Sequence, residues 1–346
     1  MKTKYALLAA VCGVLAVTSG AAQADAQKTA TTPVTIDTFI RAEADTYFRK
    51  KVEEAGGVGR LNHIRMPVPI DSNKQSIIRM NRDTIYSMGV FDLTNPVTVI
   101  KPDTGDRFQS MVVTSEDHYI KQVAYGPGKY TLTSERIGTR YVQVVFRTLV
   151  NPGNLADVKA ANALQDKITV EQKAPGSFDV PDWDQASLTK LRNAVLVLGA
   201  TVADSSKMFG DVDEVEPIRH LIGTAGGFGG NRREDAIYLN VNPEKSDGQT
   251  PYALTVKEVP VDGFWSVSVY NADGFFEKND LTAYSFNNFT ASKNADGSIP
   301  IHFGGDPEAS NYLPIIKGWN YTVRLYRPRA EILDGEWTFP EPQPAQ

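Results

Sequence analysis

The sequence predicts a mainly β protein with two antiparallel sandwich or barrel domains, joined by a helical connector and preceded by an amphipathic helix. Short segments that alternate apolar and polar residues recur over residues 60–150 and again over residues 233–340. Turn formers such as Asn-Pro, Gly-Pro-Gly and Asn-Ala-Asp-Gly separate these segments. Strands at this spacing, with no helices between them, are typical of antiparallel sandwiches and barrels. Helix-forming composition is concentrated between the two regions, over residues 151–232.

The start of the chain, residues 1–24, has the pattern of a secretory signal peptide. Lys2 and Lys4 make a positive beginning, residues 6–17 are apolar, and residues 22–24 supply an Ala-Gln-Ala cleavage site. A helix that spans a bilayer needs about 20 apolar residues, so this run is too short to be an anchor. We therefore expect a periplasmic or secreted protein whose mature chain begins at Asp25 and has no membrane span.

Composition argues against disulfide crosslinks and against a nucleic-acid partner. Cleavage would remove Cys12, the only cysteine, so the exported chain would have no disulfide and no thiolate. Residues 25–346 are enough for two domains whose cores need no such crosslinks. The formal net charge is −5 at pH 7, and lysine and arginine form no block. Because nucleic-acid binding depends on neutralising phosphates, we expect no nucleic-acid partner.

Residues 25–59 contain one predicted helix that lies on an apolar surface. Its apolar residues recur at helical spacing with charged residues between them: Ile36, Phe39, Ile40, Tyr47 and Phe48. Thr35 or Asp37 can cap the start of this helix, and the glycine pair at residues 56–57 can end it.

The remaining elements follow from the same patterns. In the first β domain, residues 60–150, the main predicted strands are 84–93, 108–114, 119–124 and 141–148. In the connector, residues 151–232, the predicted helices are 155–165, 188–203 and 215–222. We interpret the glycine-rich run at residues 226–230 as a flexible joint. In the second β domain, residues 233–340, the predicted strands are 236–241, 252–258, 265–270, 299–303 and 319–326. The proline-rich tail, residues 341–346, is expected to be extended.

Two blocks of sequence resemble known families. The segment NRDTIYSMGVFDL, with Asp-Arg-Phe at residues 106–108 behind it, resembles the domain-of-unknown-function family DUF1254. The order of aromatic strands and Asn-Ala-Asp-Gly turns from Tyr252 to Pro340 resembles family DUF1214. The resemblance implies jelly-roll-like β barrels, but it implies no activity, because both families are named for the lack of one.

Several signatures of catalysis are missing from the sequence. It has no Gly-x-Ser-x-Gly elbow, no His-Glu-x-x-His pair and no phosphate-binding Gly-x-x-x-x-Gly-Lys loop. The four histidines are isolated from one another: His63, His118, His220 and His302. We therefore assign no catalytic residue, no metal and no cofactor, and we interpret His118 as a surface histidine.

Asn81, Asp83 and Tyr86 are the first candidates for a binding site. Asn and Asp are poor strand formers, so their place at the entrance of a strand needs a local reason. One alternative is a polar floor in the mouth of a barrel, where the carboxylate acts as a base or orients a ligand hydroxyl. The alternative that we favour is that both side chains bond the backbone and fix the turn.

Three more residues complete the set of candidates. Arg147 shares a mixed strand face with Gln143, and it can either offer two donors to an anionic ligand or form an ion pair with Asp83. Arg324 and Tyr326 lie opposite an apolar face that begins at Trp319, so they line a cleft or, as we favour, face solvent.

The hypothesis we favour is a binding or assembly module of the cell envelope, with a small molecule or an envelope polymer as its ligand. The alternative is a cofactor-independent hydrolase or lyase that uses Asp83 with Tyr86 or Arg147. A third hypothesis, a structural homo-oligomer, follows from the exposed edges that open sandwiches must cover.

Overall fold

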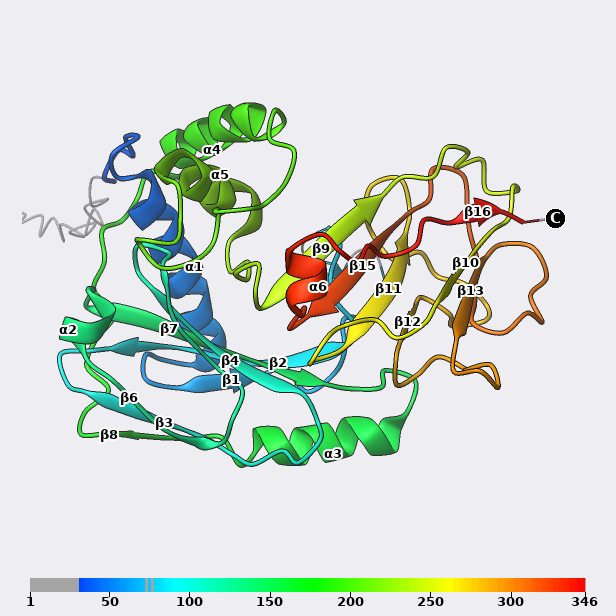
Figure 1. The fold of residues 1–346 in the computed structure, drawn as a ribbon. Helices are drawn as coiled ribbons and strands as arrows, with labels where there is room; N and C mark the ends of the chain where they lie inside the picture. Colours follow the sequence, from blue (N-terminus) through cyan, green and yellow to red (C-terminus); the bar gives the residue numbers. More distant parts are fainter. Residues whose placement is uncertain (1–30, 72–73, 76–77, 346) are drawn as a thin grey trace, which may run out of the picture.

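The computed structural model describes residues 31–71, 74–75 and 78–345. Its helices and strands form two β units side by side, with helices α1, α4 and α5 packed together above the first unit (Figure 1). The expected signal peptide lies outside the described residues. Within the described part of the chain, none of the helices combines the length and the hydrophobicity that crossing a membrane requires.

The first β unit is a sandwich of two antiparallel sheets. The larger sheet has the order β1 (Leu61–His63), β2 (Thr84–Asp92), β7 (Tyr141–Leu149), β4 (Gln109–Ser115) and β5 (Ile120–Ala124). The smaller sheet has the order β6 (Gly128–Leu132), β3 (Val97–Lys101) and β8 (Thr169–Gln172). One apolar cluster joins the facing sides of both sheets, and it includes Phe91, Val99 and Phe146. The core therefore lies between the sheets, as in a sandwich.

The second β unit has the same two-sheet plan. One sheet has the order β12 (Ser285–Asn287), β11 (Trp265–Tyr270), β15 (Asn320–Tyr326) and β9 (Ala236–Val241). The other has the order β14 (Tyr312–Leu313), β13 (Ile299–Phe303), β10 (Tyr252–Val256) and β16 (Gln343–Pro344). Trp319, Tyr321, Val323 and Leu325 are all about 1% exposed and share one cluster with Phe303. The apolar face predicted from the alternation along this strand is confirmed.

The helices cover the outer face of the larger sheet in the first unit. α1 (Phe39–Ala55) ends at Gly56, whose φ of 71° is the left-handed conformation that glycine adopts freely. Phe39 of α1 packs with Leu188 of α4 (Gln185–Gly199) and Ile222 of α5 (Pro217–Gly227). Phe48 packs against Tyr141 of β7. This cover explains why both faces of β7 are buried.

The middle of the chain differs from a purely helical connector. α3 (Leu155–Gln165) has the predicted bounds, but β8 then returns to pair with β3 of the first unit. Two one-turn helices, α2 (Ser134–Ile137) and α6 (Ala330–Leu333), complete the set in the described residues. In the tail, Gln343 pairs with Ala253, so part of the proline-rich end extends the edge of a sheet.

The expectation of a closed barrel is wrong for the part of the chain that the structure describes. The sheets are open, because their first and last strands pair with one neighbour only. In the larger sheet of the first unit, the edge strands β1 and β5 are short, and the pairing of β5 shifts register beside Thr114. Such short, irregular edges end a sheet without closing it.

Candidate ligand-binding site between the two β units

Two adjoining hollows lie at the junction of the two β units. They have volumes of about 290 Å³ and about 600 Å³, and they share Asn151, Asn287 and Thr290 as lining residues. Asn151 follows β7 of the first unit, and Asn287 ends β12 of the second. We call the two together the interdomain hollow. Its position at a junction of two units is typical of ligand sites.

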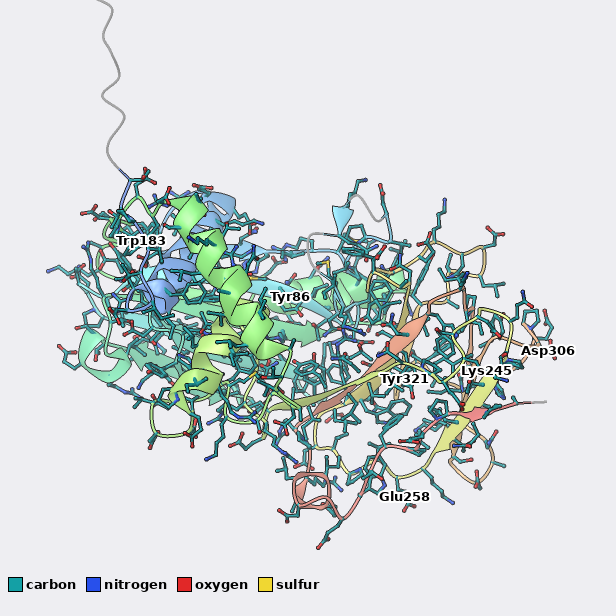
Figure 2. The ribbon with its side chains drawn as sticks, turned by 90° about the horizontal axis from the view of Figure 1, so that it is seen from above. Tyr86, Trp183, Lys245, Glu258, Asp306 and Tyr321 are labelled. Carbon is teal, nitrogen blue, oxygen red and sulfur yellow. The ribbon has the colours of Figure 1, made fainter. Side chains whose placement is uncertain are left out.

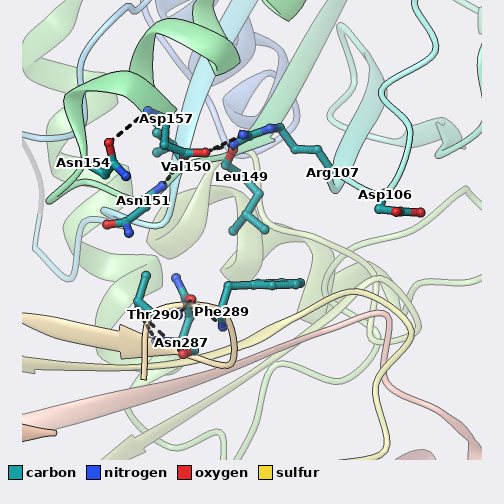
Figure 3. Close-up of a pocket in the computed structure, with 10 residues that line it drawn as sticks. All are labelled: Asp106, Arg107, Leu149, Val150, Asn151, Asn154, Asp157, Asn287, Phe289 and Thr290. Carbon is teal, nitrogen blue, oxygen red and sulfur yellow. Dashed lines mark hydrogen bonds and ion pairs between the residues drawn. The ribbon is translucent and has the colours of Figure 1, made fainter. Parts of the chain in front are cut away.

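One wall of the interdomain hollow is fixed by the turn that leads into α3 (Figure 3). Asn154 caps this helix through its Oδ1 atom, which accepts from the backbone N–H groups of Ala156 and Asp157 at 3.0 and 3.2 Å. The Asp157 carboxylate accepts the N–H of Asn151 at 2.7 Å. The cap leaves the Nδ2 group of Asn154 directed to the hollow (Figure 3).

An arginine makes this wall rigid. Arg107 binds Asp157 through two parallel contacts, Nη1–Oδ2 at 3.1 Å and Nη2–Oδ1 at 2.5 Å. Its Nη1 group also donates to the carbonyl oxygen of Leu149 at 2.7 Å. The guanidinium group lowers the pKa of Asp157, which therefore stays ionised. A ligand at this wall meets fixed polar groups.

The opposite wall is organised by Asn287 (Figure 3). Its Oδ1 accepts from the backbone N–H groups of Phe289 and Thr290, both at 3.0 Å, and its Nδ2 donates to Asp83 Oδ1 at 3.0 Å. This turn leaves the Phe289 side chain 61% exposed at the hollow. The hollow therefore combines polar amides with one accessible aromatic ring.

Asp83 forms the floor of the larger half of the hollow. Its side chain is fully buried, and Oδ2 has no partner at hydrogen-bonding geometry among the described residues. Burial raises the pKa of Asp83, while the charge of Arg324 and the polar side chains of Ser266 and Asn287 oppose the rise. A buried carboxyl group with an unused oxygen is costly, and it is suited to accept a donor from a ligand.

Asn81 fixes the turn into β2, as the favoured alternative expected of it. The same expectation for the Asp83 side chain is not met among the described residues, where its Oδ1 accepts from Asn287 Nδ2. Asn81 Oδ1 accepts the backbone N–H of Asp83 at 2.7 Å, and the carbonyl oxygen of Asp83 accepts the N–H of Val150 at 2.8 Å. Its Nδ2 donates to the hydroxyl of Tyr326 at 2.8 Å. Asn81 thus joins the two β units and does not line the interdomain hollow.

Arg147 lies apart from Asp83. The ion pair between them, one of the two alternatives for Arg147, does not form among the described residues, and Arg147 does not line the interdomain hollow. Its Nη2 donates to the carbonyl oxygen of Gly229 at 3.0 Å, and its guanidinium lies 5.7 Å from the ring of Tyr86, its partner across the sheet. The two strongest candidates from the sequence therefore do not share one cavity.

The interpretation of Arg324 and Tyr326 as a solvent face is wrong. They are 2% and 3% exposed, because the segment before β2 covers this face of β15. Arg324 Nη2 donates to the carbonyl oxygen of Arg79 at 2.8 Å and to the hydroxyl of Tyr270 at 2.7 Å. Tyr326 stacks on Phe264 at 4.3 Å between ring centroids. Both residues hold the two units together.

His118 is also buried and not on the surface. It is 2% exposed; its Nε2 accepts the N–H of Gly229 at 2.9 Å, and Nδ1 lies 2.8 Å from the hydroxyl of Thr224. Burial lowers the pKa of His118 to about 3, so the ring is neutral. Gly229 is therefore held by His118 through its N–H and by Arg147 through its carbonyl, which makes the predicted glycine joint a fixed contact.

Sequence reasoning missed most of the residues that line the hollow. Asn154 could have been found, because an Asn directly before a predicted helix is a cap. Arg107 entered only as part of a family motif, and Asp157 and Phe289 carry no local signal. They become a site only because residues 50 positions apart, Arg107 and Asp157, meet in the fold.

Comparisons with known proteins agree with this division of the chain. Residues 58–172 match DUF1254, a family of proteins of unknown function. Residues 236–330 match DUF1214, also a family of proteins of unknown function. The chain carries a DUF1254 domain and a DUF1214 domain. The first match includes β8, which accounts for the strand in the expected connector.

One solved structure shows the fold. A crystal structure of the VPA0106 protein from Vibrio parahaemolyticus superposes with a TM-score of 0.67 at 18% sequence identity, and the match covers 90% of this chain and 98% of that one. A structure of an uncharacterised Burkholderia cenocepacia protein matches with a TM-score of 0.46 at 12% identity, covering 84% of this chain and 83% of that one. No curated protein matches the chain.

The charge of Asp83 is expected to cost stability at neutral pH. A raised pKa in the folded state means that the stabilising proton is present at low pH and is lost as the pH rises through that pKa. Asp83→Asn keeps the acceptor for Asn287 without the charge. Relative to wild type, it should therefore gain unfolding free energy between pH 4.5 and pH 8. Urea denaturation at both pH values measures this difference.

Asp280→Asn is the matched control, because Asp280 is exposed. Its unfolding free energy should follow wild type at both pH values. An Asp83→Asn variant that loses stability against wild type as the pH rises would contradict the account.

Proposed function

We propose that this protein is an exported, periplasmic binding module whose interdomain hollow takes a small polyhydroxylated ligand, such as a saccharide unit of the cell envelope. The observation that carries the proposal is the pair of facing polar walls, one from the DUF1254 domain and one from the DUF1214 domain, that meet at Asn151 and Asn287. Residues 1–24 support export, because they have the pattern of a signal peptide. The paired sheets of each domain support a jelly-roll-like sandwich.

The lining of the hollow matches the chemistry of a sugar. Hydroxyl groups of a sugar need donors and acceptors side by side, and the amides of Asn151 and Asn154 and the hydroxyl of Thr290 supply both. The Arg107–Asp157 pair adds charged partners that stay in place. The exposed ring of Phe289 offers an apolar surface for the C–H face of a sugar ring. The carboxyl group of Asp83 offers a buried acceptor in the floor of the interdomain hollow.

The hydrolase or lyase alternative receives no support from this geometry. It required Asp83 to act with Tyr86 or Arg147, and neither of these residues lines the hollow in which Asp83 lies. The groups that act on Asp83 are Asn287, Ser266 and the charges of Arg324 and Arg82. They hold the carboxyl group and provide no second reacting group.

Titration calorimetry with saccharide probes tests the proposal. The probes are N,N′-diacetylchitobiose, maltose and trehalose, each to about 10 mM, a range that detects millimolar affinity. We expect at least one to bind, and Phe289→Ala should weaken its affinity by about tenfold, a loss of about 1.4 kcal/mol. The Phe289 ring is mostly exposed, so the fold should be unaffected.

Val197→Ala is the matched control, because Val197 is 71% exposed on α4 and does not line the interdomain hollow. It should bind the probe as wild type does. Absence of binding with all three saccharides, or equal affinity of Phe289→Ala and wild type, would contradict the proposed function.

A further inference from the structure

A third hollow, of about 550 Å³, lies on the far side of the DUF1254 domain. It is formed by α1, the turn after β4, the start of β7 and residues 179–183, and it shares no lining residue with the interdomain hollow. Figure 2 shows Trp183, one of its lining residues, at one end of the molecule, with Tyr86 between it and Tyr321 of the DUF1214 domain. We call it the acid-pair pocket after two of its lining residues, Asp45 and Glu116.

Asp45 and Glu116 are buried side by side. They are 1% and 5% exposed, and both line the pocket. Burial and the Asp45 carboxyl group raise the pKa of Glu116, whereas the hydrogen bond between the two carboxyl groups lowers the pKa of Asp45 against the rise that burial causes. Asp45 Oδ2 accepts the Nε1–H of Trp183 at 2.8 Å, and Glu116 Oε2 accepts the N–H of Tyr141 at 3.4 Å. Asp45 Oδ1 receives no N–H from the described residues. Two carboxyl groups in contact need one proton between them, so the pair carries one negative charge.

The shared proton is exchangeable near neutral pH. Burial raises the pKa of Glu116 to about 7, and the carboxyl group of Asp45 adds to the rise while Arg41 opposes it. Burial also raises the pKa of Asp45, against the indole N–H of Trp183. Two adjacent negative charges at this buried position would repel each other. The shared proton neutralises one of the two carboxyl groups.

The arginines at the pocket, Arg41 and Arg140, already form their shorter contacts with carboxylates outside the acid pair. Arg41 donates through Nε to Asp117 at 3.0 Å and reaches Glu116 only at 3.7 Å. Arg140 binds Asp92 at 2.9 Å. The charged and titratable groups that face the pair or line the pocket are Arg41 and Arg49 of α1, Arg140, Tyr141 and Asp179. Asp117 is paired with Arg41. Because Arg41 and Arg140 bind other carboxylates, one more positive charge can be accommodated beside Asp45 and Glu116.

We propose that the acid-pair pocket binds a small primary amine, whose ammonium group takes the place of the proton that Asp45 and Glu116 share. An ammonium group has three donors, enough for Asp45 Oδ1 and for Glu116 together. Val180 and Pro181 line the pocket and provide an apolar wall for an alkyl chain. Two carboxyl groups supply too few oxygens for calcium, which takes about 6–8.

Binding of the amine must release the proton. The affinity therefore rises with pH: the proton competes with the amine below the pKa of the pair and is gone above it. With that pKa at about 7, the affinity should increase about tenfold from pH 6 to pH 8. A simple alkylamine stays charged over this range, since its own pKa is about 10.

Titration calorimetry with n-butylamine tests the proposal on the wild-type protein, with n-butanol as a neutral probe of the same length. We expect butylamine to bind at pH 8, to bind about tenfold more weakly at pH 6, and to bind more tightly than butanol. At pH 6, the heat should change between buffers of different ionisation enthalpy, because a proton is released. No binding of butylamine at about 10 mM and pH 8, no proton release, or equal binding of butanol would overturn the proposal.

Glu116→Gln localises the effect. The glutamine amide can donate to Asp45 without a shared proton, so butylamine should bind at least about tenfold more weakly and with little dependence on pH. Glu54→Gln, on the exposed side of α1, and Phe289→Ala, in the interdomain hollow, should both behave as wild type. Wild-type affinity and pH dependence in a folded Glu116→Gln variant would overturn the proposal. If Glu116→Gln does not fold, the titrations of the wild-type protein with butylamine and butanol decide the proposal.

Discussion

Replacing Arg324 by methionine is expected to lower the free energy of unfolding by about 3–5 kcal/mol. The guanidinium is 2% exposed and donates to Ser268, to Tyr270 and to the backbone of Arg79. Methionine fills similar space but leaves these acceptors without donors. It also removes the charge that most opposes the rise that burial causes in the pKa of Asp83. Urea denaturation followed by far-UV circular dichroism measures the loss.

Arg329→Met is the matched control for Arg324. Arg329 is 52% exposed and forms an ion pair with Asp262 at 2.6 Å. Exposed pairs contribute about 0–1 kcal/mol, so this variant should stay close to wild type. A loss below about 1 kcal/mol for Arg324→Met would mean that Arg324 does not join the two domains in the way described.

Phe264→Ala should cost a similar amount, about 3–5 kcal/mol. The ring is fully buried where the two domains meet. It stacks on Tyr326 at 4.3 Å and meets Phe108 of the DUF1254 domain edge-on at 5.2 Å between centroids. Its loss leaves a cavity between the domains, so the DUF1214 domain should also unfold more independently. Thermal unfolding should then broaden or separate into two transitions.

The control for Phe264 is Phe289→Ala, which removes an exposed ring of the same size. It should unfold in a transition like that of wild type, with a loss within about 0.5 kcal/mol. If Phe264→Ala is as stable as this control, the aromatic contact does not couple the domains.

Several strands could be predicted because turn residues bound their sequence pattern on both sides. β9, β11 and β13 have the predicted bounds, since alternating side chains with turn residues on both sides leave little choice of position. β3 was not predicted, and β8 was assigned to the connector. β3 is as long as β13 and its burial alternates in the same way, whereas in β8 every second residue is exposed. The place of β8 in a sheet depends on β3, which lies elsewhere in the chain.

The site was harder to predict, because alternation along a strand gives the face but not what covers it. Arg324 lies opposite the apolar face as expected, yet the backbone of Arg79, 245 positions earlier, makes it part of the interior. Asp83, one of the candidates, lies in the floor of a hollow. Its partner Asn287 is 204 positions away and has no signal of its own in the sequence. The pair Asp45 and Glu116 was missed for the same reason.

The most direct test of the central claim is a crystal structure of the wild-type protein grown with the saccharide that binds in calorimetry. The account predicts one sugar ring in the interdomain hollow, against Phe289 and within hydrogen-bonding distance of Asn154 or Asn151. A sugar bound elsewhere on the protein, with the hollow free of it at saturating concentration, would contradict the account.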